Sequence, residues 1–461
     1  MMTTHIPAAL VTLLVLSLVG CGGGSDNTSR PPCLGHYIGS GFCTGPLVYT
    51  VGGTVSGLAG SKLELTTYGY YVSDTAAISA NGSFVFSAKY AEGDDYDVFV
   101  SAQPGNPSQT CLVTNGAGTV GSSNVVNISI SCTTGVANAK LTGTYTAVDY
   151  SSAGESGRLW TVTFDGVGQF SAIDIRNNTG TVDIITISGT YTVAADGTLN
   201  ISVNGSSTLT GGLAADGSTW VISQTTADGY MLPEILVGIK QGAMPYSSAN
   251  LTGAYTAAHY GYASTGDSSG LWTVTFDGAG NFSGTDTVNN AGIVSSAAVS
   301  GTYAIAPNGA LIITPDGGST ITGGLSADGI TWVASQLTAG VSPEILVGIK
   351  QGSMAYSSAS LNGTYAAAHY GYRSIGGLWA VVFDGTGTFI GTDYLNSTST
   401  TSSVGISGTY TVAVDGALNL HVAGDPTVTG GVSADGNTWV GSQTASGEMP
   451  SILVGVLRVS P

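Results

Sequence analysis

Charged side chains are scarce in this sequence. Only 8% of its 461 residues are Asp, Glu, Lys or Arg, and 10 basic residues against 28 acidic ones give a formal net charge of -18. Such a field repels a phosphate backbone, so nucleic acid is not an expected partner. Blocks of like charge and apolar runs with the helical period are also absent. Neither an acidic tail nor a membrane-surface helix is therefore expected.

Catalytic and metal-binding motifs are missing as well. The chain holds no Gly-x-Ser-x-Gly elbow, no Walker-type phosphate loop and no His-Glu-x-x-His motif. Its Asp-Gly segments lack the alternating oxygen ligands of a calcium loop. One of them, "SADGITW" at 326–332, is a residue shorter than the Asp-box of sialidases, and a type I′ turn is expected there instead. We expect no enzyme activity, no metal site and no cofactor.

The residues that are abundant favour β-structure. Apolar residues make up 42% of the chain, Gly reaches 70, and Ser and Thr supply most of the polarity. Low charge with high Thr, Val, Tyr and Gly suits strands whose solvent face carries hydroxyl groups. The length is sufficient for several domains.

The N-terminus carries an export signal. The apolar run at 8–20 is too short to span a bilayer as a mature helix. It ends in Leu-Val-Gly-Cys, which resembles the lipobox of bacterial lipoproteins. The resemblance implies that residues 1–20 are removed and that Cys21 becomes the lipidated N-terminus. Because Gly22 is not Asp, it also implies a lipid anchor in the outer membrane, with the protein facing the periplasm or the cell surface.

Residues 21–46 have the composition of a flexible tether, stiffened by the adjacent pair Pro31 and Pro32. Apart from Cys21, the chain has an even set of four cysteines, which fits an oxidising compartment. Four cysteines allow three pairings. We favour the one in which each pair lies within one segment, Cys33 with Cys43 and Cys111 with Cys132.

Residues 47–134 alternate with the period of a β-strand. We expect a disulfide-bonded β-sandwich whose core faces include Tyr96, Val98 and Val100 on one strand, with a tight hairpin at Asn81-Gly82. A second core face is predicted to contain Val126, Ile128, Ile130 and Cys132. The pattern resembles the transthyretin-like and carboxypeptidase-regulatory-like sandwiches of secreted bacterial proteins. In those families the module is a spacer or accessory domain.

The rest of the chain repeats one unit three times. "LTGTYTAVDYSS" begins at residue 141, "LTGAYTAAHYGY" at 251 and "LNGTYAAAHYGY" at 361, which is a spacing of 110 residues both times. In every copy, 31 residues separate the first Trp from a later Tyr, and 29 separate that Tyr from the second Trp. The units span 139–248, 249–358 and 359–461.

Eight short strands are predicted in each unit. In the second copy they are 253–260, 271–276, 281–287, 300–306, 310–314, 321–327, 331–336 and 344–350. Asp-Gly or Asn-Gly turns join the second strand to the third, the fourth to the fifth and the sixth to the seventh. In an up-and-down meander these turns lie at one end, and the connections that vary in length lie at the other. The fold class is therefore all-β, with an N-terminal sandwich followed by three tandem eight-stranded up-and-down barrels.

The opening "LTGxY" and the closed meander resemble the lipocalin and avidin barrels, from which no ligand residue is transferred. Alternation places Tyr255, Ala257 and His259 on one face of the first strand. The aromatic and histidine residues that follow this strand form a candidate binding rim at the variable end: Tyr150, Tyr260, Tyr262, Tyr370, Tyr372, His259 and His369. Exposed tyrosines there could stack on sugars or anchor a protein, or they could plug the barrel mouth.

A second architecture is a six-bladed propeller, in which each repeat supplies two blades. It would bring Asp149, His259 and His369 to one axis and make a metal site possible. Separate barrels keep the three apart, and zinc needs at least three nearby protein ligands. Ring closure between the strands near Leu141 and Leu453 would distinguish the propeller from the barrels.

The functional hypothesis is a non-enzymatic cell-surface lipoprotein that presents repeated barrels for adhesion or for binding a glycan or a protein. Repeated units allow weak single sites to act together. The alternatives are a spacer protein with filled barrels and no ligand, and a glycan hydrolase with two carboxylates facing each other across an open rim.

Overall fold

The computed structural model describes residues 48–459. The residues within that range that it does not describe are 70–71, 103, 105–108, 135–136, 152–155, 179–180, 204–207, 224–232, 244, 264–265, 353–354, 372–374, 397–400 and 425–426. The predictions on Cys21, Cys33, Cys43 and Tyr372 lie outside the described residues, as does the side chain of Tyr262.

The N-terminal domain is a β-sandwich, as predicted. Its two four-stranded sheets have the orders β5-β2-β10-β8 and β4-β3-β7-β9, and β1 pairs with β6. The strands are β1 (Val48–Tyr49), β2 (Val51–Ser56), β3 (Leu63–Gly69), β4 (Val72–Ile78), β5 (Gly82–Val85), β6 (Tyr90–Ala91), β7 (Asp95–Ala102), β8 (Gln109–Thr114), β9 (Ala117–Thr119) and β10 (Val125–Thr134).

The disulfide between Cys111 and Cys132 is present, as predicted. The two cysteines lie directly opposite each other on β8 and β10, with their Cα atoms 3.9 Å apart. Closing a loop between residues 111 and 132 restricts the unfolded chain and should stabilise this domain by about 3 kcal/mol.

Two details of the sandwich differ from the predictions. Val126 is 70% exposed, because the register of β10 against β2 shifts between Val125 and Ile128 and turns Val126 away from the core. The hairpin at Asn81-Gly82 is also wrong. β4 pairs only with β3, and β5 pairs with β2, so this turn carries the chain from one sheet to the other.

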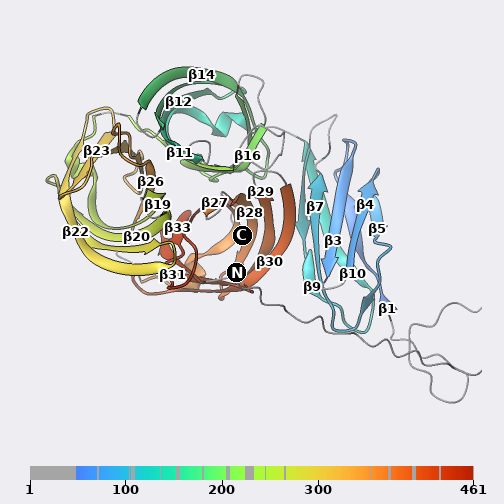
Figure 1. Cartoon of the computed structure of the whole chain (residues 1–461). Coiled ribbons are helices and arrows are strands. Elements are labelled where there is room, and N and C mark those ends of the chain that lie inside the picture. Colours follow the sequence, from blue (N-terminus) through green and yellow to red (C-terminus); the bar gives the residue numbers. More distant parts are fainter. Residues whose placement is uncertain are drawn as a thin grey trace, which may run out of the picture. The chain divides into compact units, whose positions relative to one another are not determined.

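Each of the three repeats closes into its own eight-stranded antiparallel barrel, which confirms the predicted fold class (Figure 1). Barrel 1 contains β11 (Thr142–Ser151), β12 (Ser156–Asp165), β13 (Gln169–Asn178), β14 (Thr181–Val193), β15 (Thr198–Val203), β16 (Thr208–Leu213), β17 (Thr219–Ser223) and β18 (Glu234–Lys240).

Barrel 2 contains β19 (Thr252–Ala263), β20 (Gly266–Asp277), β21 (Asn281–Asn290), β22 (Ile293–Ile305), β23 (Ala310–Pro315), β24 (Ile321–Leu325), β25 (Thr331–Ser335) and β26 (Glu344–Lys350). Barrel 3 contains β27 (Asn362–Gly371), β28 (Ile375–Asp384), β29 (Thr388–Asn396), β30 (Thr401–Val412), β31 (Ala417–Val422), β32 (Thr427–Val432), β33 (Thr438–Ser442) and β34 (Ser451–Val459). Short 3-10 turns precede the barrels at Asn138–Lys140, Ser248–Asn250 and Ser358–Ser360.

The closing pair in every barrel joins the last strand to the first strand of the same unit. Thus β18 pairs with β11, β26 with β19 and β34 with β27. A propeller would instead require the last strand of the chain to pair near Leu141. The propeller is therefore wrong, because every unit satisfies its own strand edges.

The end of each barrel with the short turns is filled by aromatic side chains. In barrel 2, the buried rings of Tyr255, Phe276 and Tyr303 pack edge to face. The Tyr255 hydroxyl donates to the carbonyl of Gly329 (2.6 Å), and the Tyr303 hydroxyl donates to that of Leu251 (2.7 Å). Because this end is closed, a ligand can bind only at the other end, which is called the mouth below.

The turn at Asp328-Gly329 is not type I′. Gly329 has a φ of 71°, but Asp328 keeps a negative φ, because the non-glycine residues with positive φ in the described chain are Lys62, Asn115 and Ala291. The amide of Gly329 donates to the carbonyl of Ser326, and that of Ser326 donates to Thr331. This is a type I turn followed by a left-handed glycine. The Asp328 carboxylate also accepts from the amide of Ile330 (2.9 Å), which favours this turn.

Candidate functional site

The first strand of each barrel sends neighbouring residues to opposite sides. In β19, Tyr255 and Ala257 pack in the interior of barrel 2, whereas Ala258 and Tyr260 belong to a different cluster that contains residues of all three barrels. The same alternation places His259 inside its barrel, as its contacts with interior residues described below indicate.

Tyr150, Tyr260 and Tyr370 are buried, with 1%, 0% and 2% of their surface exposed. Of the two alternatives that the sequence left open, exposed recognition residues or a plug of the barrel mouth, these values exclude the first for the three tyrosines. Their rings meet one another instead, with centroids 5.1 to 5.4 Å apart and steep interplanar angles. Such edge-to-face contacts are favourable beyond the area that they bury.

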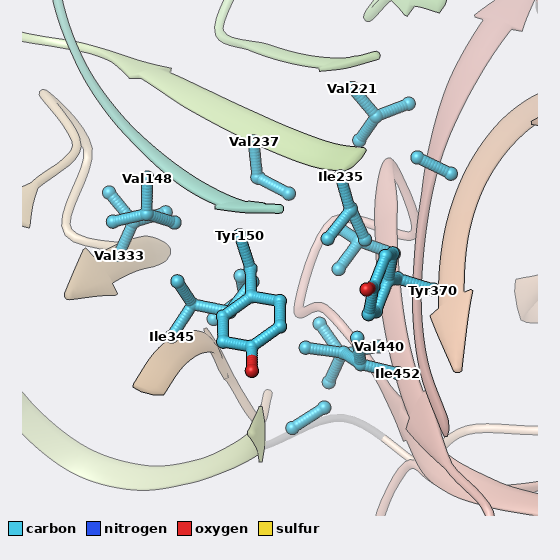
Figure 2. Packing of buried hydrophobic residues seen from close by; sticks show 14 of the residues in the cluster. Val148, Tyr150, Val221, Ile235, Val237, Val333, Ile345, Tyr370, Val440 and Ile452 are labelled. Carbon is cyan, nitrogen blue, oxygen red and sulfur yellow. The ribbon is translucent and has the colours of Figure 1, made fainter. Parts of the chain in front are cut away.

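These tyrosines are the centre of a shared core, defined here as the buried apolar residues that the three barrels contribute between them. Figure 2 shows Tyr150 and Tyr370 among valines and isoleucines of all three units. Strands β18, β26 and β34 supply much of it, because their outward residues are as apolar as their inward ones.

Hydrogen bonds between the barrels follow one cyclic order. A backbone amide at the Asp-Gly turn between the sixth and seventh strands donates to a carbonyl at the end of another barrel's last strand. The pairs are Ala327 to Lys240 (3.0 Å), Ala434 to Lys350 (3.0 Å) and Ala215 to Leu457 (2.9 Å). Each barrel thus contacts both others, and the outward face of the first strand is not available for a ligand.

The mouth of barrel 2 holds a buried histidine between two carboxylates. His259 Nε2 lies 3.1 Å from Asp286 Oδ1, and Nδ1 lies 2.7 Å from Glu344 Oε1. Burial alone would lower the pKa of His259, but the two carboxylates outweigh it and raise this pKa to about 10. His259 is therefore an imidazolium at neutral pH.

The mouth of barrel 3 has the same histidine with one carboxylate. His369 Nε2 lies 2.9 Å from Asp393 Oδ1, in the pose of His259. The residue in the place of Glu344 is Ser451, since Gly261 pairs with Glu344 and Gly371 pairs with Ser451.

The mouth of barrel 1 replaces the histidine with an ion-pair cluster. Arg158 Nη1 lies 3.1 Å from Asp149 Oδ2, and Arg176 Nε donates to Asp174 Oδ2 at 2.6 Å. Glu234, paired opposite Ser151, occupies the position of Glu344. Burial raises the pKa of Glu234, and the charge of Asp149 adds to the rise.

Barrels 2 and 3 place a histidine opposite a glycine, and barrel 1 places an aspartate opposite an arginine at the same position. His259 pairs with Gly270 and His369 with Gly377, whereas Asp149 pairs with Arg158. A Cβ atom at Gly270 would lie 2.1 Å from His259 Nε2, so the imidazole fits only against a glycine. In barrel 1 the shorter Asp149 leaves room for the arginine that neutralises it.

Sequence reasoning found His259 and His369 but missed their partners. A carboxylate signal was present, since Asp174, Asp286 and Asp393 each follow the first Trp of their unit by 14 residues. In the structure each aspartate pairs directly opposite that Trp. Asp149, His259 and His369 lie in separate barrels, and no group of three or more His, Cys, Asp or Glu side chains among the described residues is arranged so that it could hold a metal ion.

A pocket of about 330 Å³ opens at the mouth of barrel 3. Its polar lining includes His369, Asp393 and Ser451, and its apolar lining includes Trp379 and Met449. This volume is at the lower end of the range for pockets that bind small molecules.

Wild-type protein should lose stability relative to a His259→Gln variant as the pH rises from about 6.5 towards 10. The folded-state pKa of His259 is raised to about 10, so the stabilisation by the imidazolium is complete below the unfolded pKa and is lost as the pH passes the folded one. Partial exposure of Glu344 screens the pair, and we expect a loss of roughly 2 to 3 kcal/mol. Urea titrations of both proteins at a series of pH values measure it, and parallel profiles would contradict the assignment.

Comparisons with known proteins give little further information. No family model matches the chain, and no curated protein matches it. One similar solved structure is isotype 1 transferrin binding protein B from serogroup B Neisseria meningitidis, with 12% identity, a TM-score of 0.24 and coverage of 68% of this chain and 75% of that one. Another is the H. pylori beta clamp in complex with 5-chloroisatin, with 9% identity, a TM-score of 0.11 and coverage of 68% and 90%. Scores this low support no inference about function.

Among the described residues, no helix is long and apolar enough to cross a membrane.

Proposed function

We propose that this chain is a non-enzymatic, lipid-anchored binding protein of the bacterial outer membrane, which presents its barrels to a glycan or a protein. The lipobox-like Leu18–Cys21 segment supports the anchor, and the disulfide between Cys111 and Cys132 supports an oxidising compartment.

The observation that supports the binding role is that the parts of each barrel differ in what they can contact. One end is closed by aromatic packing, and the first strand is committed to the shared core. The mouths are the parts whose side chains differ from one barrel to the next. Barrel 1 has ion pairs there, barrel 2 has an imidazolium and barrel 3 has a pocket. Variable residues on a rigid scaffold are the usual arrangement in binding proteins.

The direct test is a glycan and matrix-protein array probed with the whole mature chain. We expect a restricted set of ligands to bind above background. A folded chain that binds nothing on either array would instead favour a spacer role. The array should use the full chain, since the barrels share one core.

Replacing Cys21 with alanine should release the protein from the membrane. In the lipoprotein interpretation the sulfur of this residue carries the lipid, and without it no acyl chain holds the chain at the bilayer. Metabolic labelling with a radioactive fatty acid, followed by membrane fractionation, measures the effect. The matched control is Cys43→Ala, which should keep both the label and the membrane fraction. Retention of label in the Cys21→Ala protein would contradict the anchor.

A further inference from the structure

At the mouth of barrel 2, the carboxylate of a glutamate side chain contacts the histidine. Glu344 is the first residue of β26, and its Oε1 atom lies 2.7 Å from His259 Nδ1. The other ring nitrogen of His259 is held by Asp286. In this barrel a side chain fills the place where a bound acid would contact the imidazolium.

Barrel 3 has the same frame without that carboxylate. His369 contacts Asp393 through Nε2, as His259 contacts Asp286. Ser451 stands where Glu344 stands, and its hydroxyl is too short to reproduce the carboxylate. The Ser451 Oγ atom is buried and has no hydrogen-bond partner among the described residues. A buried hydroxyl without a partner is costly unless something else supplies one.

The pocket lies at this vacant position. His369 and Ser451 both line it, together with Asp393. The apolar part of the lining includes Trp379, Met449 and Pro450. The pocket therefore offers both donors for an anionic group and a surface for an apolar body.

We infer that the mouth of barrel 3 binds a small organic acid, whose carboxylate takes the place of the Glu344 carboxylate and whose apolar body lies against Trp379 and Met449. His369 Nδ1 and the Ser451 hydroxyl donate to the two oxygens of the acid. The net charge of -18 opposes the approach of an anion only weakly, since physiological salt screens charges beyond about 8 Å. This site goes beyond the proposed surface role and does not depend on it.

The test is a calorimetric titration of the whole mature chain with hexanoate and with phenylacetate, each compared with its neutral amide. We expect one site per chain for the acids, and binding of the amides at least about tenfold weaker, because they lack the charge-assisted hydrogen bonds. Equal binding of acids and amides, or no binding of either acid, would overturn the inference.

Two variants locate the site, and a third is the matched control. Ser451→Glu restores the arrangement of barrel 2, so it should abolish acid binding without lowering the melting temperature. His369→Gln should also abolish it. Glu344→Gln changes the equivalent position of barrel 2 and should leave the titration unchanged. Acid binding that survives in a folded Ser451→Glu protein would contradict the site. The Ser451→Glu protein is also applied to the glycan and matrix-protein array. Array binding by this variant is expected if the surface role holds, whether or not the acid site exists, so the two failures can be distinguished.

Discussion

Replacing Tyr260 with alanine should destabilise all three barrels together. Its ring is fully buried and packs against Tyr150 and Tyr370, with centroid distances of 5.2 and 5.1 Å. Loss of a buried aromatic ring costs about 3 to 5 kcal/mol. Because the residues around it belong to all three barrels, the cost is not confined to barrel 2. Hydrogen exchange read by mass spectrometry should show faster exchange in peptides of β17, β18 and β34.

The matched control is Tyr303→Ala, which removes a ring of the same size from the interior of barrel 2. It should lower the stability of that barrel and leave exchange in β18 and β34 close to wild type. If Tyr260→Ala affected only peptides of barrel 2, as the control does, the shared core would not couple the barrels.

Substituting alanine for Gly348 should strongly destabilise barrel 2. Gly348 pairs with Trp332, and a Cβ atom there would lie 2.1 Å from the indole ring. Trp332 is fully buried and packs against Phe276, so it cannot move away without disturbing the aromatic packing at the closed end of the barrel. Overpacking of this kind costs about 1 to 3 kcal/mol, and we expect the upper end. Thermal unfolding followed by tryptophan fluorescence measures it.

Two comparisons make the Gly348 result specific. Gly121→Ala adds the same methyl group where nothing lies within 4 Å, so it should have little effect. Combining Gly348→Ala with Trp332→Leu makes room for the methyl group, and the double variant should be more stable than the sum of the single effects predicts. Strict additivity would contradict the steric explanation.

The fold was largely accessible from the sequence because turns and periodicity repeat. The predicted strand at 344–350 coincides with β26, and the Asp-Gly turns lie where expected. The turn type was missed because an Asp-Gly pair fits both a type I′ turn and a type I turn with a left-handed glycine. The negative φ of Asp328 distinguishes them, and the hydrogen bond that the Ile330 amide donates to the Asp328 carboxylate favours the type I turn.

The shared core was missed because the interpretation assigned a single buried face to each strand. A signal was present in β18 and β26, whose five central residues, Ile-Leu-Val-Gly-Ile, are all apolar and buried. Such runs are typical of strands buried on both faces. They contrast with β22, whose exposed and buried residues alternate near its end. Tyr260 directly follows His259, and neighbouring residues of a strand point to opposite faces. Tyr260 therefore lies in the shared core, whereas His259 lies at the mouth.

The partners of the histidines were missed, because the contacts depend on register between strands and the regular spacing of the aspartates was not used. Glu344 reaches His259 only because β26 closes the barrel against β19. The equivalence of Ser451 in barrel 3 and Glu344 was readable from the sequence, since each follows the second Trp of its unit by 12 residues.

Hydroxyl-radical footprinting of the native chain tests the central claim most directly. The account predicts that Tyr150, Tyr260 and Tyr370 remain unmodified, because each is at most 2% exposed within the shared core. Met449, which is 44% exposed, should be oxidised rapidly in the same sample and serves as the internal reference. Oxidation of the three tyrosines at rates typical of exposed rings would contradict the account, because the barrels would then not be joined through their first strands.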